Sequence, residues 1–252
     1  MKIKQYFELF KFPRMIFFIE VIIGYFIASN FKFNNILIWG FISLSLLVYP
    51  GIYMLNDILD KKEDCKDSKK KLRPIASGII SVKEGFAFLI IVMALGLILG
   101  YLIDVRLFAM NLVFILFNLV YSIYLKHIPY IEFISNGITH ALRFYLGIIL
   151  SGSYNYLLLT ISILLLSCGF SALKRENEIL NKRLSRKTLK SYSLNKLYIT
   201  YLIIFILLNF ILVYNNAFKI IILLEILIFV LIILLYHSSS LLQSKMDSYL
   251  RF

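Results

Sequence analysis

Long apolar runs dominate this chain and constrain its fold more than any other feature. A helix needs about 20 apolar residues to cross the hydrocarbon core of a bilayer, which is about 30 Å thick. The sequence lacks strand-like alternation in these runs, so helices are expected to satisfy the backbone in lipid. It therefore predicts an all-α, polytopic transmembrane bundle in a single domain, 1–252. About eight spans are expected, at 15–31, 36–55, 86–103, 105–124, 131–150, 155–173, 197–214 and 218–236.

The basic residues lie mainly in alternate loops. The segments before the first run and after the second, fourth, sixth and eighth runs carry 23 of the 27 Lys and Arg residues. Because Lys and Arg are enriched in cytoplasmic loops, both termini are expected to face the cytoplasm, with the chain integral to the plasma membrane. This asymmetry and the attraction of anionic headgroups account for the net charge of +13, so no nucleic-acid partner is expected.

Carboxylates gather where the second apolar run ends. Asp57, Asp60 and Asp64 stand at i, i+3 and i+7, positions that share one face of a continuous helix. So much negative charge beside a bilayer is costly unless a cation lies between the oxygens, and Mg²⁺ is usually bound by a few carboxylates together with substrate phosphates. These three residues, with Asn56 as an amide-oxygen ligand, are the predicted Mg²⁺ ligands. A solvated helix end is the alternative interpretation.

Basic side chains follow the carboxylates within one short loop, at Lys69, Lys70, Lys71 and Arg73. Phosphate oxygens need charge-assisted donors of this kind. A diphosphate leaves more readily when Mg²⁺ and Lys or Arg neutralise its developing charge, so a diphosphate-bearing donor is the expected substrate. The candidate phosphate ligands are Arg73, Lys126, Lys174 and Arg175.

Arg143 lies roughly in the middle of the fifth run and must face protein or water rather than lipid. It is expected either to bind a substrate phosphate or to pair with Glu132. The two residues are eleven positions apart, which is about three helical turns. This separation disfavours the direct pair and favours a role in a cavity. Glu20 and Glu225 also lie within apolar runs, and the sequence assigns neither of them a role.

Two segments resemble motifs of the UbiA-type membrane prenyltransferases. The first is Asn56-Asp57-x-x-Asp60-x-x-x-Asp64, followed by Arg73-Pro74-Ile75-Ala76-Ser77-Gly78, and the second is Tyr121-Ser122-Ile123-Tyr124-Leu125-Lys126. The resemblance implies a helical bundle with a central cavity opening to the cytoplasmic side. It also implies an Asp-rich Mg²⁺ site for a diphosphate donor and a polyisoprenoid substrate among the helices. The family usually has nine helices, one more than the runs found here.

The second motif region departs from the family's usual Asp-x-x-x-Asp. It reads Lys174-Arg175-Glu176-Asn177-Glu178 and continues to Arg186, Leu189 and Tyr192. This pattern resembles the branch that moves phosphoribose from phosphoribosyl diphosphate onto a polyprenyl phosphate, and Glu132 and Arg143 match that branch loosely. Chemistry and resemblance together assign catalytic roles to Asp57, Asp60, Lys126, Lys174 and Glu178, and substrate binding to Arg73, Lys126, Arg143, Lys174 and Arg175.

Two reactions remain open for such a transferase. In phosphoribosyl transfer the sugar carries the diphosphate and the lipid phosphate attacks, and the Lys174 to Glu178 motif favours this reaction. In prenyl transfer an isoprenoid carries the diphosphate and an aromatic or glycerol-type acceptor attacks, as is usual in the family. A transporter or non-catalytic scaffold is the alternative of another class. A transporter predicts acidic residues near the membrane midplane, whereas the cluster here lies at the cytoplasmic edge.

Overall fold

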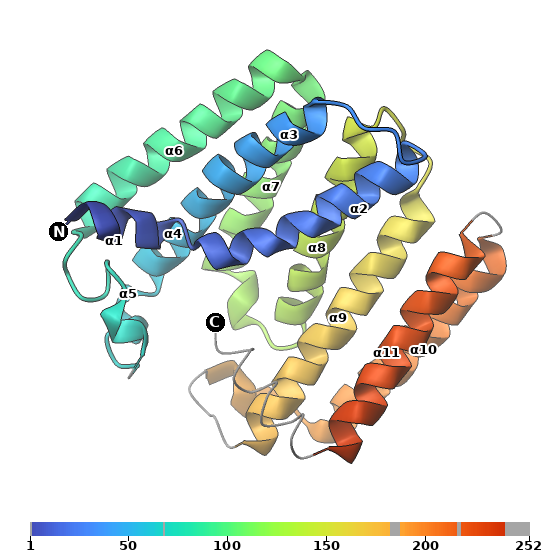
Figure 1. The fold of residues 1–252 in the computed structure, drawn as a ribbon. Coiled ribbons are helices and arrows are strands. Elements are labelled where there is room, and N and C mark those ends of the chain that lie inside the picture. Colours follow the sequence, from blue (N-terminus) through green and yellow to red (C-terminus); the bar gives the residue numbers. More distant parts are fainter. Residues whose placement is uncertain (1, 68, 182–186, 216–217, 240–252) are drawn as a thin grey trace. The chain divides into compact units, whose positions relative to one another are not determined.

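The computed structural model describes residues 2–67, 69–181, 187–215 and 218–239. Over these ranges the chain is helical and contains no strand (Figure 1), which confirms the predicted all-α class. It divides into two compact units, one formed by Met1–Tyr124 with Leu142–Asn155 and the other by Leu125–Ala141 with Tyr156–Phe252. Helix α8 (Ile131–Leu150) contributes its first half to the second unit and its other half to the first.

The first unit holds most of the helices before α8. They are α1 (Lys2–Leu9), a 3₁₀ segment Phe12–Phe18, α2 (Ile19–Ala28), α3 (Ile36–Gly40), a π-helical segment Phe41–Val48, α4 (Tyr49–Leu59), α5 (Lys61–Asp64), a 3₁₀ turn Lys70–Leu72, α6 (Val82–Ile103) and α7 (Val105–Ile123). The second unit contains 3₁₀ turns at Leu125–His127 and Lys187–Ser191, and helices α9 (Leu157–Leu180), α10 (Leu194–Tyr214) and α11 (Lys219–Ser238).

Seven helical stretches among the described residues are long and apolar enough to cross a membrane. They correspond to the predicted runs from 36–55 onward. The predicted first span, 15–31, differs, because a 3₁₀ segment precedes the ten-residue helix α2. Pro13 near the start of this segment and the left-handed backbone of Lys11 (φ 49°, ψ 48°) interrupt the helix there. The count of eight spans and the central cavity both remain predictions.

The span Ile36–Leu59 carries the Asp-rich segment at its end and is widened in its middle by the π-helical turn. The π-helical segment ends at Val48, two positions before Pro50, which cannot donate a backbone hydrogen bond and crowds the preceding turn. Side chains from the neighbouring helices fix this stretch. Ser43 Oγ donates to the Gly96 carbonyl at 2.8 Å, and Asn111 Nδ2 donates to Ser43 Oγ at 2.7 Å.

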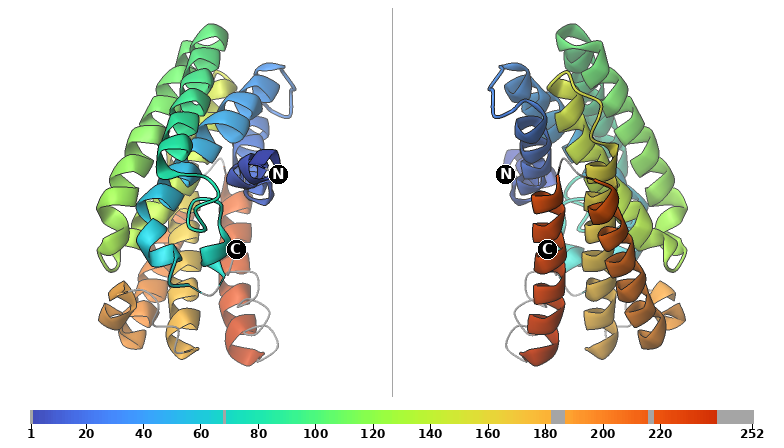
Figure 2. Two further views of the ribbon diagram at one scale, coloured as in Figure 1. Left: turned by 90° about the vertical axis from the view of Figure 1, so that its left-hand side faces the viewer. Right: turned by 90° about the vertical axis from the view of Figure 1, so that its right-hand side faces the viewer.

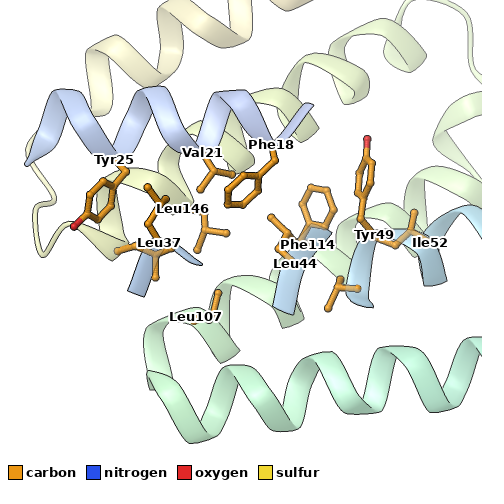
Figure 3. Close-up of a cluster of buried hydrophobic side chains, with 12 residues drawn as sticks. Phe18, Val21, Tyr25, Leu37, Leu44, Tyr49, Ile52, Leu107, Phe114 and Leu146 are labelled. Atoms are coloured by element: carbon orange, nitrogen blue, oxygen red, sulfur yellow. The ribbon is translucent and has the colours of Figure 1, made fainter. Parts of the chain in front are cut away.

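Apolar side chains from these segments form the core of the first unit (Figure 3). Helix α2 and the second half of α8 cross here at close range. A Cβ atom on Gly147 would lie 2.0 Å from the Val21 carbonyl oxygen, and one on Gly24 would lie 2.2 Å from that of Phe144. Only glycine allows backbones to approach so closely.

In the second unit, helices α9, α10 and α11 lie side by side (Figures 1 and 2). Their apolar faces meet around buried residues such as Leu208 and Phe229. Gly169 of α9 provides room for the ring of Phe229, whose Cε2 atom would lie 2.3 Å from an added Cβ. Glu176 and Asn177 of the second motif lie at the end of α9 and contact α10 and α11.

Candidate functional site

The Asp-rich segment does not form the continuous helix that its spacing predicts. Helix α4 ends at Leu59, and Asp60 (φ −88°, ψ 2°) separates it from α5. Asp57 and Asp64 are each only 2% exposed, whereas Asp60 is half-buried. Within the described ranges, no three Asp, Glu, His or Cys side chains are grouped to hold a metal ion. The structure therefore brings two of the three predicted carboxylates together.

Arg73 joins these two carboxylates. Its Nη1 donates to Asp57 Oδ1 at 3.0 Å and to Asp64 Oδ2 at 2.7 Å. Lys70 Nζ lies 3.8 Å from Asp64 Oδ1. Burial raises the pKa of Asp64, and the charges of Arg73 and Lys70 oppose that shift. The basic loop thus contacts the acidic segment, as expected of a charge-compensated site.

The loop that presents Arg73 is held by its own hydrogen bonds. Asp67 Oδ1 accepts from the backbone N–H groups of Lys69 at 2.9 Å and Lys70 at 3.0 Å, and these bonds lower the pKa of Asp67. After the turn, the Arg73 carbonyl accepts from the Ser77 N–H at 2.8 Å, and Ile75 is buried in a small apolar cluster. The position of Arg73 is therefore set by a folded loop.

Lys11, from the N-terminal segment, also reaches Asp57. Its Nζ lies 2.6 Å from Asp57 Oδ1 and 5.3 Å from the centre of the Tyr53 ring. The Arg14 guanidinium lies over the same ring at 4.6 Å. Burial lowers the pKa of Lys11 to about 8, while the charge of Asp57 acts in the opposite direction. The acidic segment is thus enclosed by cations from two parts of the first unit.

The residues present fit a hard divalent cation. Asp57 Oδ2 is buried and has no hydrogen-bond partner among the residues that the structure describes. An unpaired buried carboxylate oxygen is costly, and a metal ion would satisfy it. Asp64 shares Arg73 with Asp57, and carboxylate oxygens are the ligands that Mg²⁺ prefers. Ligation by Asp60 and Asn56 remains a prediction.

Arg143 lies in the same unit and is only 4% exposed. Its Nε donates to Glu20 Oε2 at 2.7 Å and its Nη1 to Tyr49 Oη at 3.2 Å. Tyr53 Oη donates to Tyr49 Oη at 2.9 Å, so polar and aromatic contacts extend from Lys11 to Arg143. The ion partner of Arg143 that the structure shows is Glu20, a residue to which the sequence assigned no role.

In the second unit, Arg175 is enclosed by carboxylates. Its Nε and Nη2 donate to Glu132, and its Nη1 donates to Glu178. Tyr192 Oη donates to Glu132 Oε1 at 3.0 Å and accepts from the Tyr130 N–H at 2.9 Å. Burial and the charge of Glu132 raise the pKa of Tyr192. Every nitrogen of the guanidinium that can donate is therefore directed at a carboxylate.

The two residues between Arg175 and Glu178 point toward tyrosines. Glu176 is fully buried, and its Oε2 accepts from Tyr201 Oη at 2.7 Å. Asn177 Oδ1 accepts from Tyr236 Oη at 2.9 Å. His237 Nε2 lies 3.6 Å from Glu176 Oε1. These contacts join the end of α9 to α10 and α11.

The other predicted ligands lie just after α7 and in α9. Lys126 lies in the 3₁₀ turn Leu125–His127 and Lys174 lies in α9, and both are half-buried. Leu189 and Tyr192 of the second motif are buried, whereas Arg186 lies outside the described residues. The catalytic and substrate-binding roles of these residues remain predictions.

Sequence reasoning missed several members of these networks. Lys11 stands far from the Asp-rich segment in the chain, and its only signal is its place in the basic N-terminal segment. Glu20 carried a stronger signal, because an acid within an apolar run needs a partner. The tyrosines gave none, since aromatic residues are common throughout such helices. The missed members are Lys11, Glu20, Tyr49, Tyr53, Tyr201 and Tyr236.

The UbiA prenyltransferase family matches residues 17–251 of this chain. A digeranylgeranylglyceryl phosphate synthase of Sulfolobus acidocaldarius is 30% identical over 166 residues, which are 65% of this chain and 59% of that protein. The chain spans between 26% and 59% of the length of the curated relatives that it matches.

Solved structures share the fold. A UbiA homologue from Archaeoglobus fulgidus bound to GPP and Mg²⁺ has a TM-score of 0.78 at 19% identity, covering 93% of this chain and 87% of that one. A structure of digeranylgeranylglyceryl phosphate synthase has a TM-score of 0.75 at 22% identity, covering 99% and 93%. At these identities the likeness establishes the fold, and the substrates of those proteins are their own.

Proposed function

This chain belongs to the UbiA prenyltransferase family, and we propose that it transfers an isoprenoid group from a prenyl diphosphate to a glycerol-phosphate or aromatic acceptor, with Mg²⁺ as cofactor. The observation that carries the proposal is the buried pair Asp57 and Asp64 at the end of a membrane-capable helix, bridged by Arg73. Relatives support the choice, because a digeranylgeranylglyceryl phosphate synthase is 30% identical and a homologue of the same fold binds GPP and Mg²⁺.

The site's own residues suit a diphosphate leaving group. In prenyl transfer the bond between isoprenoid C1 and the diphosphate oxygen breaks, the acceptor's nucleophilic atom bonds to C1, and the acceptor loses a proton. When bound, Mg²⁺ would neutralise the negative charge that develops on the oxygens of the leaving diphosphate. Asp57, Asp64, Asp60 and Asn56 would hold it. Arg73 would donate N–H groups to the diphosphate and keep it in place while the C1–O bond breaks.

The second unit favours this reaction over phosphoribosyl transfer, which the sequence pattern favoured. A phosphate-binding wall needs donors that are free to meet phosphate oxygens. Each of the three guanidinium nitrogens of Arg175 instead donates to Glu132 or Glu178, so we assign Arg175 a structural role at the end of α9. The names of the relatives point the same way, to the glycerol-type acceptor that was the alternative expectation. Roles for Lys126, Lys174 and Glu178 in binding the acceptor remain part of the proposal.

A transfer assay tests the reaction class. Purified full-length protein in detergent with Mg²⁺ receives labelled geranylgeranyl diphosphate together with geranylgeranylglyceryl phosphate or 4-hydroxybenzoate. A parallel arm receives labelled phosphoribosyl diphosphate with polyprenyl phosphate. Product in a prenyl arm that disappears in Asp57→Asn supports the proposal. Product only in the phosphoribosyl arm overturns it and restores the other reaction.

We also propose that both termini and the Asp-rich loop lie on the cytoplasmic side of the plasma membrane. The split of basic residues between alternate loops supports this orientation. Single cysteines at Lys62 and Asn34, in a background lacking Cys65 and Cys168, test it with an impermeant thiol reagent on intact cells. Labelling at Asn34 and protection at Lys62 are expected, and the reverse pattern contradicts the orientation.

A further inference from the structure

We propose that Lys11 is a built-in counter-ion of Asp57 that makes metal binding depend on the simultaneous arrival of an anionic diphosphate. The inference rests on the proposed function, because it concerns the metal and diphosphate of that site. It goes further by assigning to Lys11, which lies outside the motif region, control over how strongly the binding of one depends on the other.

The position of Lys11 is constrained, unlike that of an ordinary surface lysine. It adopts a left-handed backbone (φ 49°, ψ 48°) between α1 and the following 3₁₀ segment, which residues with a side chain rarely do. Its side chain is 15% exposed and passes over the ring of Tyr53, which Arg14 also covers. This arrangement directs the ammonium group at one oxygen of Asp57.

The two oxygens of Asp57 differ sharply. Oδ1 lies 2.6 Å from Lys11 Nζ and 3.0 Å from Arg73 Nη1. Oδ2 is buried, and no hydrogen-bond partner for it occurs in the part of the chain that the structure describes. One oxygen of the carboxylate is thus shared by two cations, and the other is left for a further ligand. A hard divalent cation such as Mg²⁺ would satisfy it.

The charges in this cluster nearly cancel before any metal binds. Asp57 and Asp64 contribute two negative charges, and Lys11 and Arg73 contribute two positive charges in direct contact with them. A divalent cation arriving alone meets both cations at short range and leaves the site positively charged. A diphosphate brings the compensating negative charge and accepts hydrogen bonds from the same donors. Metal and diphosphate should therefore bind with strong positive coupling.

Removal of the Lys11 charge should weaken the coupling between metal and diphosphate by strengthening the binding of metal alone. In Lys11→Met the aliphatic stem over Tyr53 is largely kept, whereas the repulsion between the ammonium group and the metal is lost. We expect the variant to bind metal alone about tenfold more tightly than the wild type, which corresponds to about 1.4 kcal/mol. Because bound diphosphate already offsets this repulsion in the wild type, the gain in metal affinity caused by diphosphate should shrink by a similar factor in the variant. The gain in diphosphate affinity caused by metal should shrink equally, since coupling is reciprocal.

The experiment uses purified full-length protein in detergent and Mn²⁺ as a spectroscopic probe for the Mg²⁺ site. Electron paramagnetic resonance measures Mn²⁺ binding without diphosphate, and equilibrium dialysis measures binding of labelled inorganic pyrophosphate with and without Mn²⁺. Lys11→Arg keeps the charge and should retain the weak binding of Mn²⁺ alone. Lys62→Met removes an exposed lysine of the same segment and serves as the matched control. Lys11→Gln provides a second neutral variant if Lys11→Met is not monodisperse.

The outcomes separate the inference from the proposed function. Tighter binding of Mn²⁺ alone in the neutral Lys11 variants, with Lys62→Met unchanged, supports the inference. Unchanged binding in these variants, or an equal gain in Lys62→Met, overturns it and leaves the metal site standing. Absence of Mn²⁺ binding in every protein, with and without pyrophosphate, overturns the metal site and the inference together.

Discussion

Arg143 Nε donates to Glu20 Oε2 at 2.7 Å, and this ion pair connects positions 123 residues apart in the sequence. The pair forms because α2 and α8 approach closely at Gly24 and Gly147. The guanidinium also lies over the rings of Phe17 and Tyr49 at 5.3 Å and 5.5 Å. An arginine inside a membrane-capable helix is thus satisfied within the first unit, by an acid and by aromatic faces.

Loss of the acid should therefore destabilise the fold strongly. Glu20→Ala removes the carboxylate to which Arg143 Nε donates, and breaking a buried ion pair costs about 3–5 kcal/mol of the free energy of unfolding. Reversible unfolding in mixed micelles measures the change, and Glu8→Ala, an exposed acid of α1, is the control. The double variant Glu20→Leu with Arg143→Met should be more stable than Glu20→Ala. A Glu20→Ala protein as stable as the control contradicts this account.

The hydroxyl of Tyr201 should matter for stability in the second unit. It donates to Glu176, which is fully buried, so Tyr201→Phe leaves a carboxylate oxygen short of a donor. We expect a loss of about 1–3 kcal/mol in the free energy of unfolding. Tyr214→Phe, at an exposed position of the same helix, should change stability little. Equal effects of both substitutions on the unfolding midpoint would argue against a buried donor role.

The fold was largely predictable, because apolar runs longer than 18 residues determine helices in lipid without regard to distant partners. The exception is instructive. The run 15–31 has the composition of a span, yet Pro13 and the left-handed Lys11 make its beginning a 3₁₀ segment. Hydropathy measures what a segment prefers to contact, whereas these two residues act through backbone geometry.

The candidate site was predictable only where its residues are neighbours in the chain. The spacing of Asp57 and Asp64, together with the basic loop after them, predicted the residues that form the Arg73 bridge. Lys11 and Glu20 could not be found in this way, since their partners are 46 and 123 positions distant and the packing of helices decides the pairing. The interruption at Asp60 was also not predictable from the spacing of the carboxylates, because that spacing was interpreted on a continuous helix.

Arg73 should control affinity for the diphosphate donor. It is the cation that contacts both buried carboxylates, and loss of a charge-assisted contact costs about 1.5–3 kcal/mol. Arg73→Gln should therefore raise the apparent KM for a prenyl diphosphate by about 10- to 150-fold. Lys71→Gln, an exposed neighbour in the same loop, should leave that KM nearly unchanged. Steady-state kinetics at saturating acceptor measure both values. An equal KM in the two variants would contradict a role for Arg73 in binding the donor.

The carboxylate pair should determine the response of the enzyme to metal. Asp57→Asn keeps the size of the side chain and removes the charge that Lys11 and Arg73 compensate, so the affinity for Mg²⁺ should fall together with turnover. Asp67→Asn serves as the control. It changes a carboxylate of the adjoining loop that accepts hydrogen bonds from backbone N–H groups.

Dialysis against a chelator should abolish prenyl transfer by the wild type, and added Mg²⁺ should restore it. The Mg²⁺ concentration that gives half-maximal activity should rise at least about tenfold in Asp57→Asn, as expected for the loss of one charged ligand. An Asp57→Asn enzyme with the activity and metal response of the Asp67→Asn control would show that the buried pair is a structural ion cluster.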